Sequence, residues 1–188
     1  MKYIVLDMEW NRPTHRKSMR RDGIALSGDI IQIGAVKTDE NFKTIDTFSI
    51  LVKPTYYTKM NKDVSELTGI TKDMLDEAKA FPEAMEEFLA WAGDDSDLLT
   101  WSGNDIEMLW RNMYFYDMDF ERVPGCYDMQ IMFDDQVTDE GRDFALSYAI
   151  WKLGIKPRIA HDALNDALNT LEVIRRLDFS EGYMQYAV

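Results

Sequence analysis

The sequence predicts an α/β fold, in which a mixed sheet is covered by helices. Three apolar runs in the first 52 residues have the length and composition of strands, and a polar Asp39-Glu40-Asn41 turn joins the second to the third. Beyond Pro54 the pattern alternates between helical periodicity and short strands. A chain of 188 residues lies within the range of one domain, so we expect a single domain over 1–188 with its core at about 2–177.

The expected strands share an apolar core bounded by polar or turn-forming residues. In order they cover 2–8, 30–36, a third ending at 47–52, 97–101 and 126–127. The segment at about 11–29 is then a long insertion between the first two strands. Connections of this length are uncommon and often functional.

The expected helices are marked by caps and by apolar stripes. Thr71 can cap one helix, Gly69 can end the preceding turn, and Pro82 lies at the start of another helix. In order the helical segments cover 63–67, 72–78, 81–91, 105–116, a stretch from 128, 144–153 and 163–177.

Composition limits the classes of protein to consider. Hydrophobic residues make up 46% and charged residues 29%, which is ordinary for a soluble globular protein. One cysteine, Cys126, allows no intrachain disulfide, and no apolar stretch reaches the length of a membrane span. We therefore expect a cytoplasmic protein with no membrane partner, in which Cys126 is a small buried residue.

The net charge of −13 argues against a nucleic-acid partner unless positive charge is gathered locally. One eleven-residue stretch of the insertion does gather it, and its cations are Arg12, Arg16, Lys17, Arg20 and Arg21. These residues can guide a phosphate backbone, or they can be the solvated charges of a surface loop, and the sequence favours neither.

Four carboxylates and one imidazole suit a metal-dependent phosphodiesterase. Asp7 and Glu9, at i and i+2, share one face of a strand, while Asp105 and Asp166 each lie at the start of a helix. Such carboxylates can bind two divalent ions that activate water and align the reacting oxygens. His161 can take a proton from the water because imidazole exchanges protons near neutral pH. Each residue also has a structural alternative: a strand end for the first pair, a helix cap or first-turn acid for the others, and a loop histidine for the imidazole.

The order of the motifs resembles the DEDDh exonucleases, a ribonuclease-H-like family that removes nucleotides from 3′ ends. The resemblance covers about residues 2–177, and the sister subfamily has a tyrosine where this chain has Asp162. The motifs that carry it are Val5-Leu6-Asp7-Met8-Glu9, Ile30-Ile31-Gln32-Ile33-Gly34-Ala35-Val36, Glu66-Leu67-Thr68-Gly69-Ile70-Thr71, Ser102-Gly103-Asn104-Asp105 and His161-Asp162-Ala163-Leu164-Asn165-Asp166-Ala167.

The resemblance implies a mixed five-stranded sheet and a role for each motif residue. Two Mg²⁺ or Mn²⁺ ions would be held by Asp7, Glu9, Asp105 and Asp166, with His161 as general base and nucleoside 5′-monophosphates as products. The residues expected near the terminal nucleotide are Met8, Trp10, Leu67, Thr68 and Asn104. Trp10 departs from the family, where a smaller residue is common, and it can stack on a base, close the pocket or belong to the core.

Three functions remain open at this point. Trp10, Asn11 and the motif at 66–71 look most like exoribonucleases that trim small and structured RNAs, so RNA is favoured over DNA as the partner. A DNA proofreading or repair exonuclease has the same catalytic set. A non-catalytic module that binds nucleic acid or protein would be expected to lack a catalytic position, and none is missing here.

Overall fold

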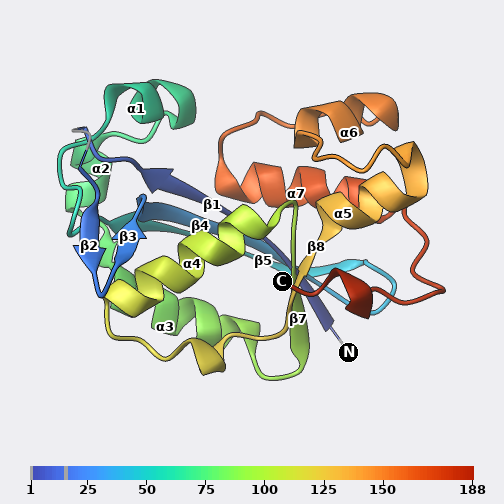
Figure 1. The fold of residues 1–188 in the computed structure, drawn as a ribbon, viewed down its shortest axis with the longest axis horizontal. Coiled ribbons are helices and arrows are strands. Elements are labelled where there is room, and N and C mark those ends of the chain that lie inside the picture. Colours follow the sequence, from blue (N-terminus) through green and yellow to red (C-terminus); the bar gives the residue numbers. More distant parts are fainter. Residues whose placement is uncertain (1, 15–16) are drawn as a thin grey trace.

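The computed structural model describes residues 2–14 and 17–188 and contains a six-stranded mixed sheet (Figure 1). Its strand order is β6-β5-β4-β1-β7-β8, with β1 beside antiparallel β4 and parallel β7. The strands are β1 (Lys2–Asn11), β4 (Asp29–Thr38), β5 (Thr44–Lys53), β6 (Lys79–Ala80), β7 (Ser96–Thr100) and β8 (Cys126–Asp128). The predicted α/β class is therefore confirmed, and the two-residue β6 extends the five expected strands at one edge.

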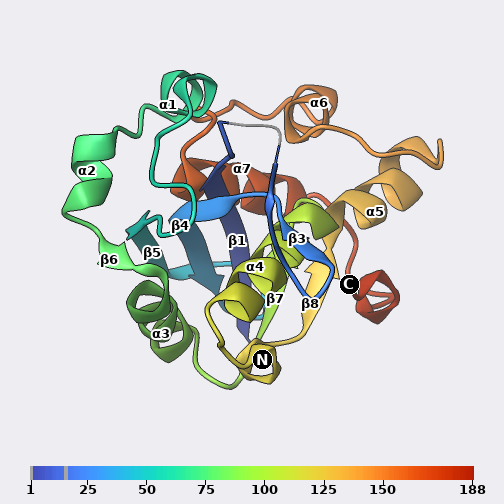
Figure 2. The same cartoon turned by 60° about the vertical axis from the view of Figure 1, so that its left-hand side comes forward.

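The insertion between β1 and β4 contains a hairpin that the sequence analysis treated as a plain connection. Strand β2 (Met19–Arg21) pairs with β3 (Ile24–Leu26) in a small sheet of its own. Asp22 and Gly23 both have positive φ, 49° and 84°, which suits the Asp-Gly signal of a two-residue hairpin turn. The hairpin lies against one end of helix α4 (Gly103–Phe115) in Figure 2.

The helices follow the expected segments, with small differences at their ends. They are α1 (Lys62–Thr68), α2 (Lys72–Asp76), α3 (Phe81–Ala92), α4, α5 (Met129–Phe133), α6 (Leu146–Lys152) and α7 (Ala163–Ile174), and 3₁₀ turns lie at Phe120–Arg122 and Met184–Tyr186. Helix α6 begins later than predicted because the Phe144 carbonyl accepts bonds from the Trp101 and Gln130 side chains. Helix α7 ends earlier because the N–H of Leu177 bonds back only three residues.

Asp134 is a buried carboxylate at the end of α5. It begins a π-helix at Asp134–Thr138 and accepts bonds from the backbone N–H groups of Glu140, Gly141 and Arg142. The carboxylate therefore closes the turn that leads toward α6.

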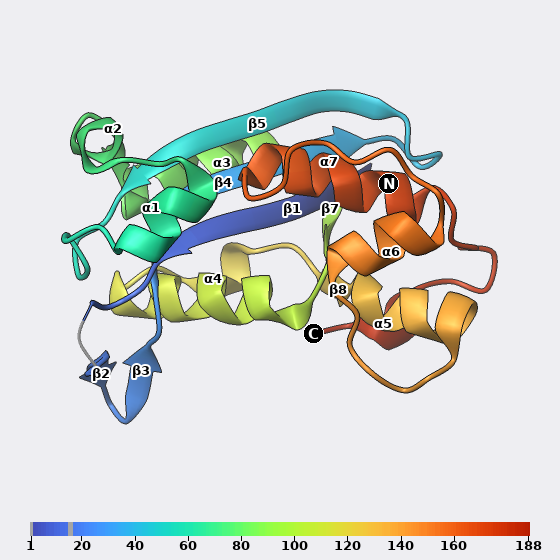
Figure 3. The ribbon, with the colours of Figure 1, turned by 90° about the horizontal axis from the view of Figure 1, so that it is seen from above.

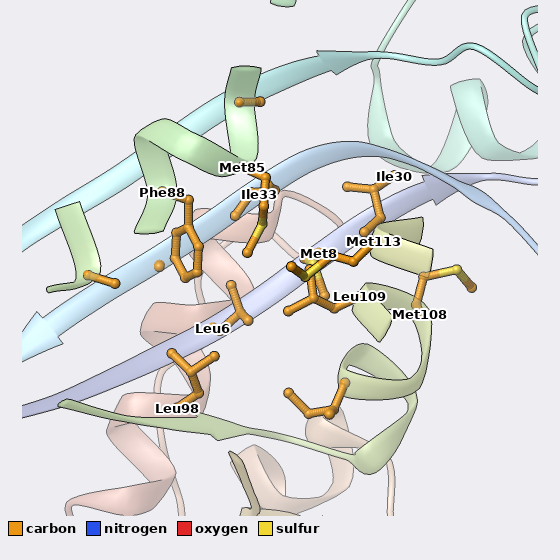
Figure 4. Packing of buried hydrophobic residues seen from close by; sticks show 14 of the residues in the cluster. Leu6, Met8, Ile30, Ile33, Met85, Phe88, Leu98, Met108, Leu109 and Met113 are labelled. Carbon is orange, nitrogen blue, oxygen red and sulfur yellow. The ribbon is translucent and has the colours of Figure 1, made fainter. Parts of the chain in front are cut away.

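The two faces of β1 belong to different layers (Figure 2). Ile4, Leu6 and Met8 point into the core formed with α3 and α4, which Figure 4 shows from close by. Tyr3 and Val5 point to the other face, where α7 packs. Because side chains alternate along a strand, Asp7 and Glu9 lie on the α7 side of the sheet.

Two further observations concern the expectations from composition. Cys126 is buried as predicted, and burial, with the nearby Asp97 carboxylate, raises the pKa of its thiol to about 12. Among the helices in the described part of the chain, none has the length and apolar character needed to cross a membrane.

Candidate active site

The site begins at the carboxyl-terminal half of β1, in the middle of the sheet. Asp7 pairs with Gly34 of β4, and the register shifts between Glu9 and Trp10 at an irregularity of the strand. Helix α7 packs on this face of the sheet (Figure 3), and both carboxylates interact electrostatically with Asp166 in its first turn. The strand therefore places the carboxylates of Asp7 and Glu9 opposite Asp166, which lies in the first turn of α7.

Helix α7 approaches the sheet so closely that only a glycine fits beneath it. A Cβ on Gly34 would lie 2.2 Å from the carbonyl carbon of Ala163 and from the nitrogen of Leu164. Gln32 adds a bidentate link, since its side chain accepts a bond from the Ala163 N–H and donates one to Asp162. These contacts hold the first turn of α7, and with it Asp166, above Asp7.

His161 and Asp166 are fixed to each other at the same point. The backbone N–H of His161 donates to the Asp166 carboxylate at 2.7 Å, and His161 has a φ of 64°, in the left-handed region. One imidazole nitrogen, one oxygen of Glu9 and one oxygen of Asp166 lie within 4.8 Å of one another. The side chain of Asn169, which is buried, donates at 3.3 Å to Oδ1 of Asp166, whereas the His161 N–H donates to Oδ2.

Asp105 reaches the site from the first turn of α4. Ser102 caps this helix, and the Asp128 carboxylate accepts a bond from the Gly103 N–H, which anchors the turn to β8. The Asp105 carboxylate accepts a bond from the backbone N–H of Met8 at 3.1 Å. Asp105 therefore lies directly beside β1, between the positions of Asp7 and Glu9 along the strand.

The pKa values show that the carboxylates repel one another. Burial raises the pKa of Asp7 well above its usual value, and the charges of Asp105, Asp166 and Glu9 raise it further. Burial, with the charges of Asp166 and Asp105, raises the pKa of Glu9 to about 7. Burial also raises the pKa of Asp105 to about 7, although the bond from the Met8 N–H opposes the change.

This donor set fits a divalent cation. Several carboxylate oxygens, which are hard ligands, converge on one region. Their burial and mutual repulsion raise their pKa values, and a bound cation would relieve that repulsion. All four carboxylates predicted from the sequence belong to this electrostatic cluster. The predicted general base, His161, stands at its exposed edge.

Comparison with known proteins agrees with this geometry. The family model described as Exonuclease (RNase_T) matches residues 4–174. The chain belongs to the exonuclease family. Residues 4–174 thus form an exonuclease domain of the DEDDh type, a class of metal-dependent 3′–5′ exonucleases.

The relatives differ in the size and setting of this domain. A DNA polymerase III of PolC type from Thermotoga maritima is 29% identical over 150 residues, which are 79% of this chain and 10% of that protein. The chain thus spans about a tenth of the length of the curated relatives it matches. The nuclease domain of 3′hExo, a DEDDh family member bound to rAMP, superposes with a TM-score of 0.76 at 20% identity, covering 93% of this chain and 90% of that one. E. coli Exonuclease I in complex with a dT13 oligonucleotide gives 0.70 at 16% identity, covering 93% and 40%.

Most of the residues predicted to meet the substrate line a hollow beside the carboxylates. This hollow, which we call the α1 pocket, has a volume of about 250 Å³ and is lined by Glu9, Trp10, Arg12, Val64, Leu67 and Thr68. Trp10 is half-buried and packs against the core as well as lining the pocket, so the core alternative is borne out in part, and stacking on a base stays a prediction. Asn104 is exposed at the start of α4.

Met8 is the exception and corrects the prediction. Its side chain is 3% exposed and lies among Leu6, Leu109 and Met113 in the core, as Figure 4 shows. The reason is the alternation of the strand, which sends Met8 to the face opposite Asp7. Its backbone N–H, which bonds to Asp105, is the part that serves the site.

The basic residues of the insertion differ in their contacts. Arg12 is exposed and lines the α1 pocket, and Lys17 and Arg20 are exposed on the hairpin side. Arg21 donates to Asp117 at 2.6 Å and lies over the ring of Tyr114, so it joins the hairpin to α4. Arg16 lies outside the described residues.

Sequence reasoning missed the residues that position the site. Gln32 and Gly34 hold the start of α7 against the sheet, and Asn169 fixes Asp166; neither Gln32 nor Asn169 has a feature that marks it in isolation. Glycine in an otherwise β-branched strand was the available signal for Gly34, because such a glycine often marks the close approach of another segment. Sequence reasoning also missed a cleft that opens from the carboxylates on the side opposite the α1 pocket.

Proposed function

We propose that this domain hydrolyses single-stranded nucleic acid stepwise from the 3′ end and releases nucleoside 5′-monophosphates. The observation that carries the proposal is the convergence of Glu9, His161 and Asp166 within 4.8 Å, beside the mutually repelling Asp7 and Asp105, which are partly buried and buried, respectively. A surface acidic cluster would not combine deep burial, a neighbouring imidazole and an adjoining pocket with an apolar wall.

Two Mg²⁺ or Mn²⁺ ions would be held by Asp7, Glu9, Asp105 and Asp166. When bound, such ions lower the charge repulsion at the scissile phosphate and favour ionisation of water. His161 would accept the proton of the attacking water, because its imidazole lies at the exposed edge of the cluster beside Glu9 and Asp166. Attack at phosphorus breaks the bond to the 3′ oxygen of the preceding nucleotide, so the phosphate leaves on the released nucleotide.

The α1 pocket would hold the terminal nucleotide. It begins at Glu9, its wall carries the apolar side chains of Trp10 and Leu67, and Arg12 adds a positive charge. An aromatic face for a base beside a cation for a phosphate is the usual composition of a single-strand site.

RNA is the substrate we favour, on the resemblance of Trp10, Asn11 and the motif at 66–71 to exoribonucleases. Asn11 supports this choice only indirectly, because its buried side chain bonds to the backbone of Tyr57, Lys59 and Asn61 and so positions the approach to α1. DNA is the second candidate, and the PolC-type DNA polymerases among the relatives favour it.

The test is a product analysis on matched RNA and DNA single strands labelled at the 5′ end, with Mg²⁺, Mn²⁺ or EDTA. We expect stepwise shortening that EDTA stops, with RNA shortened faster. Asp166→Asn should abolish it, whereas Asp162→Asn should retain it, because asparagine can still accept the helix-capping bond that Asp162 accepts from the Asn165 N–H. Faster shortening of DNA would replace RNA with the second candidate, and a folded, metal-loaded protein that shortens neither strand would exclude the exonuclease.

A further inference from the structure

A cleft of about 580 Å³ opens from the carboxylates on the side opposite the α1 pocket. We call it the α6 cleft; it is lined by some of the residues in the segments 101–105, 145–151 and 155–161, together with Asp7, Asp166 and Asn169. Figures 1 and 3 show α1 and α6 on either side of the start of α7, so the two hollows flank the same cluster. Apart from His161, none of the residues of α6 or of the segment after it was expected in the site from the sequence.

The outer part of the cleft is apolar and openly exposed. Trp151 lines the cleft and is 72% exposed. Ile150 and Ile155 also line it. Exposed apolar surface that lines a cleft marks a binding site more often than chance.

The aromatic wall is held in place before any ligand arrives. The ring of Tyr148 stacks on Phe144 with centroids 4.6 Å apart and contacts Trp151 at 5.7 Å. The carbonyl of Phe144 is fixed in turn by Trp101, whose indole N–H donates to it at 2.9 Å. Stacking of a ligand on the Trp151 ring would therefore cost little side-chain conformational entropy.

Positive charge borders the same cleft in a chain whose net charge is −13. Arg158 lines the cleft, and Lys156 lines an adjacent hollow that shares Ile155, Pro157 and Arg158 with it. Both cations are exposed and have no ion-pair partner within residues 2–14 and 17–188. The backbone N–H of Arg158 donates to Asn169, whose amide donates to Asp166. The segment that carries Lys156 and Arg158 is thus linked through Asn169 to Asp166, a proposed metal ligand.

We propose that the α6 cleft binds the nucleotides on the 5′ side of the scissile phosphate, with an unpaired base stacked on Trp151 and phosphates near Lys156 and Arg158. The inference rests on the proposed function, and it adds a second subsite to it. If the terminal nucleotide occupies the α1 pocket and its phosphate lies at the carboxylates, the rest of the strand must leave on the other side. The cleft is continuous with the carboxylates, and the cations beside it have no ion-pair partner among the described residues. Both features favour a nucleic-acid strand over a protein partner. Stacking on Trp151 requires an unpaired base, so this subsite selects single strands.

The test compares a substrate that fills one subsite with a substrate that fills both. The p-nitrophenyl ester of a nucleoside 5′-monophosphate reaches only the terminal site, whereas a pentanucleotide extends into the cleft. In Trp151→Ala the ratio of kcat/KM for the pentanucleotide to kcat/KM for the ester should fall about 10-fold or more, the usual effect of losing one base–aromatic stack. Ile45→Ala, at an exposed apolar position on β5, is the matched control and should leave the ratio unchanged.

Direct binding provides a second measurement that does not depend on turnover. Fluorescence anisotropy of a labelled pentanucleotide should show about 10-fold weaker binding to Trp151→Ala than to the unaltered protein. Lys156→Ala combined with Arg158→Ala should lower the slope of log affinity against log salt by about 1 or more.

The outcomes separate the inference from the proposed function. An unaltered ratio and unaltered binding in Trp151→Ala would overturn the inference while leaving an active exonuclease, and would assign the exposed surface to a protein partner instead. Absence of turnover on both substrates would overturn the proposed function. In that case weaker pentanucleotide binding by Trp151→Ala would still support the cleft as a strand-binding site, and equal binding would exclude it.

Discussion

The two hollows that flank the carboxylates are built in different ways. The α1 pocket is formed by the end of β1 and by α1, so its lining comes from two short stretches around Trp10 and Leu67. The α6 cleft is assembled from the start of α4, from α6, from the segment at 155–161 and from α7. The first is confined and lies next to the motif residues in the chain, whereas the second is larger and depends on tertiary packing. The difference suggests that the pocket serves the reaction itself and the cleft serves the choice of substrate.

The largest expected effect lies at the centre that both hollows share. Asp7→Asn removes a charge from the middle of the carboxylate cluster and weakens its attraction for cations. We expect kcat/KM to fall on the order of 10³-fold or more for the ester and the pentanucleotide alike, as for other groups that act directly at the reacting atoms. Steady-state assays on both substrates measure this change. A loss confined to one substrate would show that the two hollows do not share a catalytic centre.

Gly34→Ala is expected to shift α7, which carries Asp166, and to leave β1, which carries Asp7, in place. A methyl group at this position overlaps the backbone of α7, so the helix must shift away from Asp7 and carry Asp166 with it. We expect a loss of about 2 kcal/mol in the free energy of unfolding. We also expect about a 10²-fold loss of kcat, because small displacements of catalytic groups have large effects.

Urea unfolding and single-turnover assays measure these two quantities. Gly103→Ala is the control, since a Cβ there meets its neighbours at 3.5 Å or more, an ordinary van der Waals distance. If Gly34→Ala were as stable and active as Gly103→Ala, close approach of α7 would not be what positions Asp166.

The sequence predicted the parts of this molecule that depend on local pattern. Strands and helices follow hydrophobic periodicity and caps, and the carboxylates of β1 follow from the two-residue repeat of a strand. The same repeat, applied to Met8, would have excluded its side chain from the site. The Asp22-Gly23 turn was likewise available as a hairpin signal.

The remaining features depend on contacts between distant segments. The bond from Asn169 to Asp166 is local, but the link from Asn169 to Arg158 becomes informative only once α7 and the preceding segment are placed. The α6 cleft combines residues separated by up to about 160 positions, and Trp151 alone has no motif around it. A tryptophan on a short helix is as readily explained by a core position, so its exposure could not be foreseen.

Trp10 allows the comparison between the two hollows to be sharpened. In Trp10→Ala we expect kcat/KM to fall about 10-fold for the ester and for the pentanucleotide together, because both substrates need the terminal site. Trp151→Ala should affect mainly the longer substrate. Trp10 also packs on the core, so Trp10→Phe, which keeps an aromatic face and much of the packing, should restore most of the activity. A length-dependent effect of Trp10→Ala would reverse our assignment of the two hollows.

Stability without metal should fall as the pH rises toward neutrality. The pKa values of Glu9 and Asp105 are about 7 in the folded protein and lie well below that in the unfolded chain, so the folded state binds more protons between about pH 4.5 and 7. Its free energy of unfolding therefore decreases across this window, by about 1–3 kcal/mol. Urea unfolding in EDTA at pH 5.5 and pH 7.5 measures the change. Mg²⁺ should reduce it, and Asp7→Asn should reduce it as well; an equal dependence in all three cases would place its origin outside the carboxylate cluster.

The smallest expected effects distinguish two arginines of the insertion. Arg21 is paired with Asp117 and supports the hairpin, so Arg21→Ala should change stability by less than about 1 kcal/mol, as for other exposed ion pairs, and should hardly change strand binding. Arg12 lines the α1 pocket and has no ion-pair partner among the described residues, so Arg12→Ala should lower the slope of log affinity against log salt by about 0.7. Anisotropy titrations of a labelled single strand at several salt concentrations compare the two variants. If Arg21→Ala changed the slope as much as Arg12→Ala, the hairpin would contact phosphate in spite of its ion pair, and the terminal site would extend beyond the α1 pocket onto the insertion.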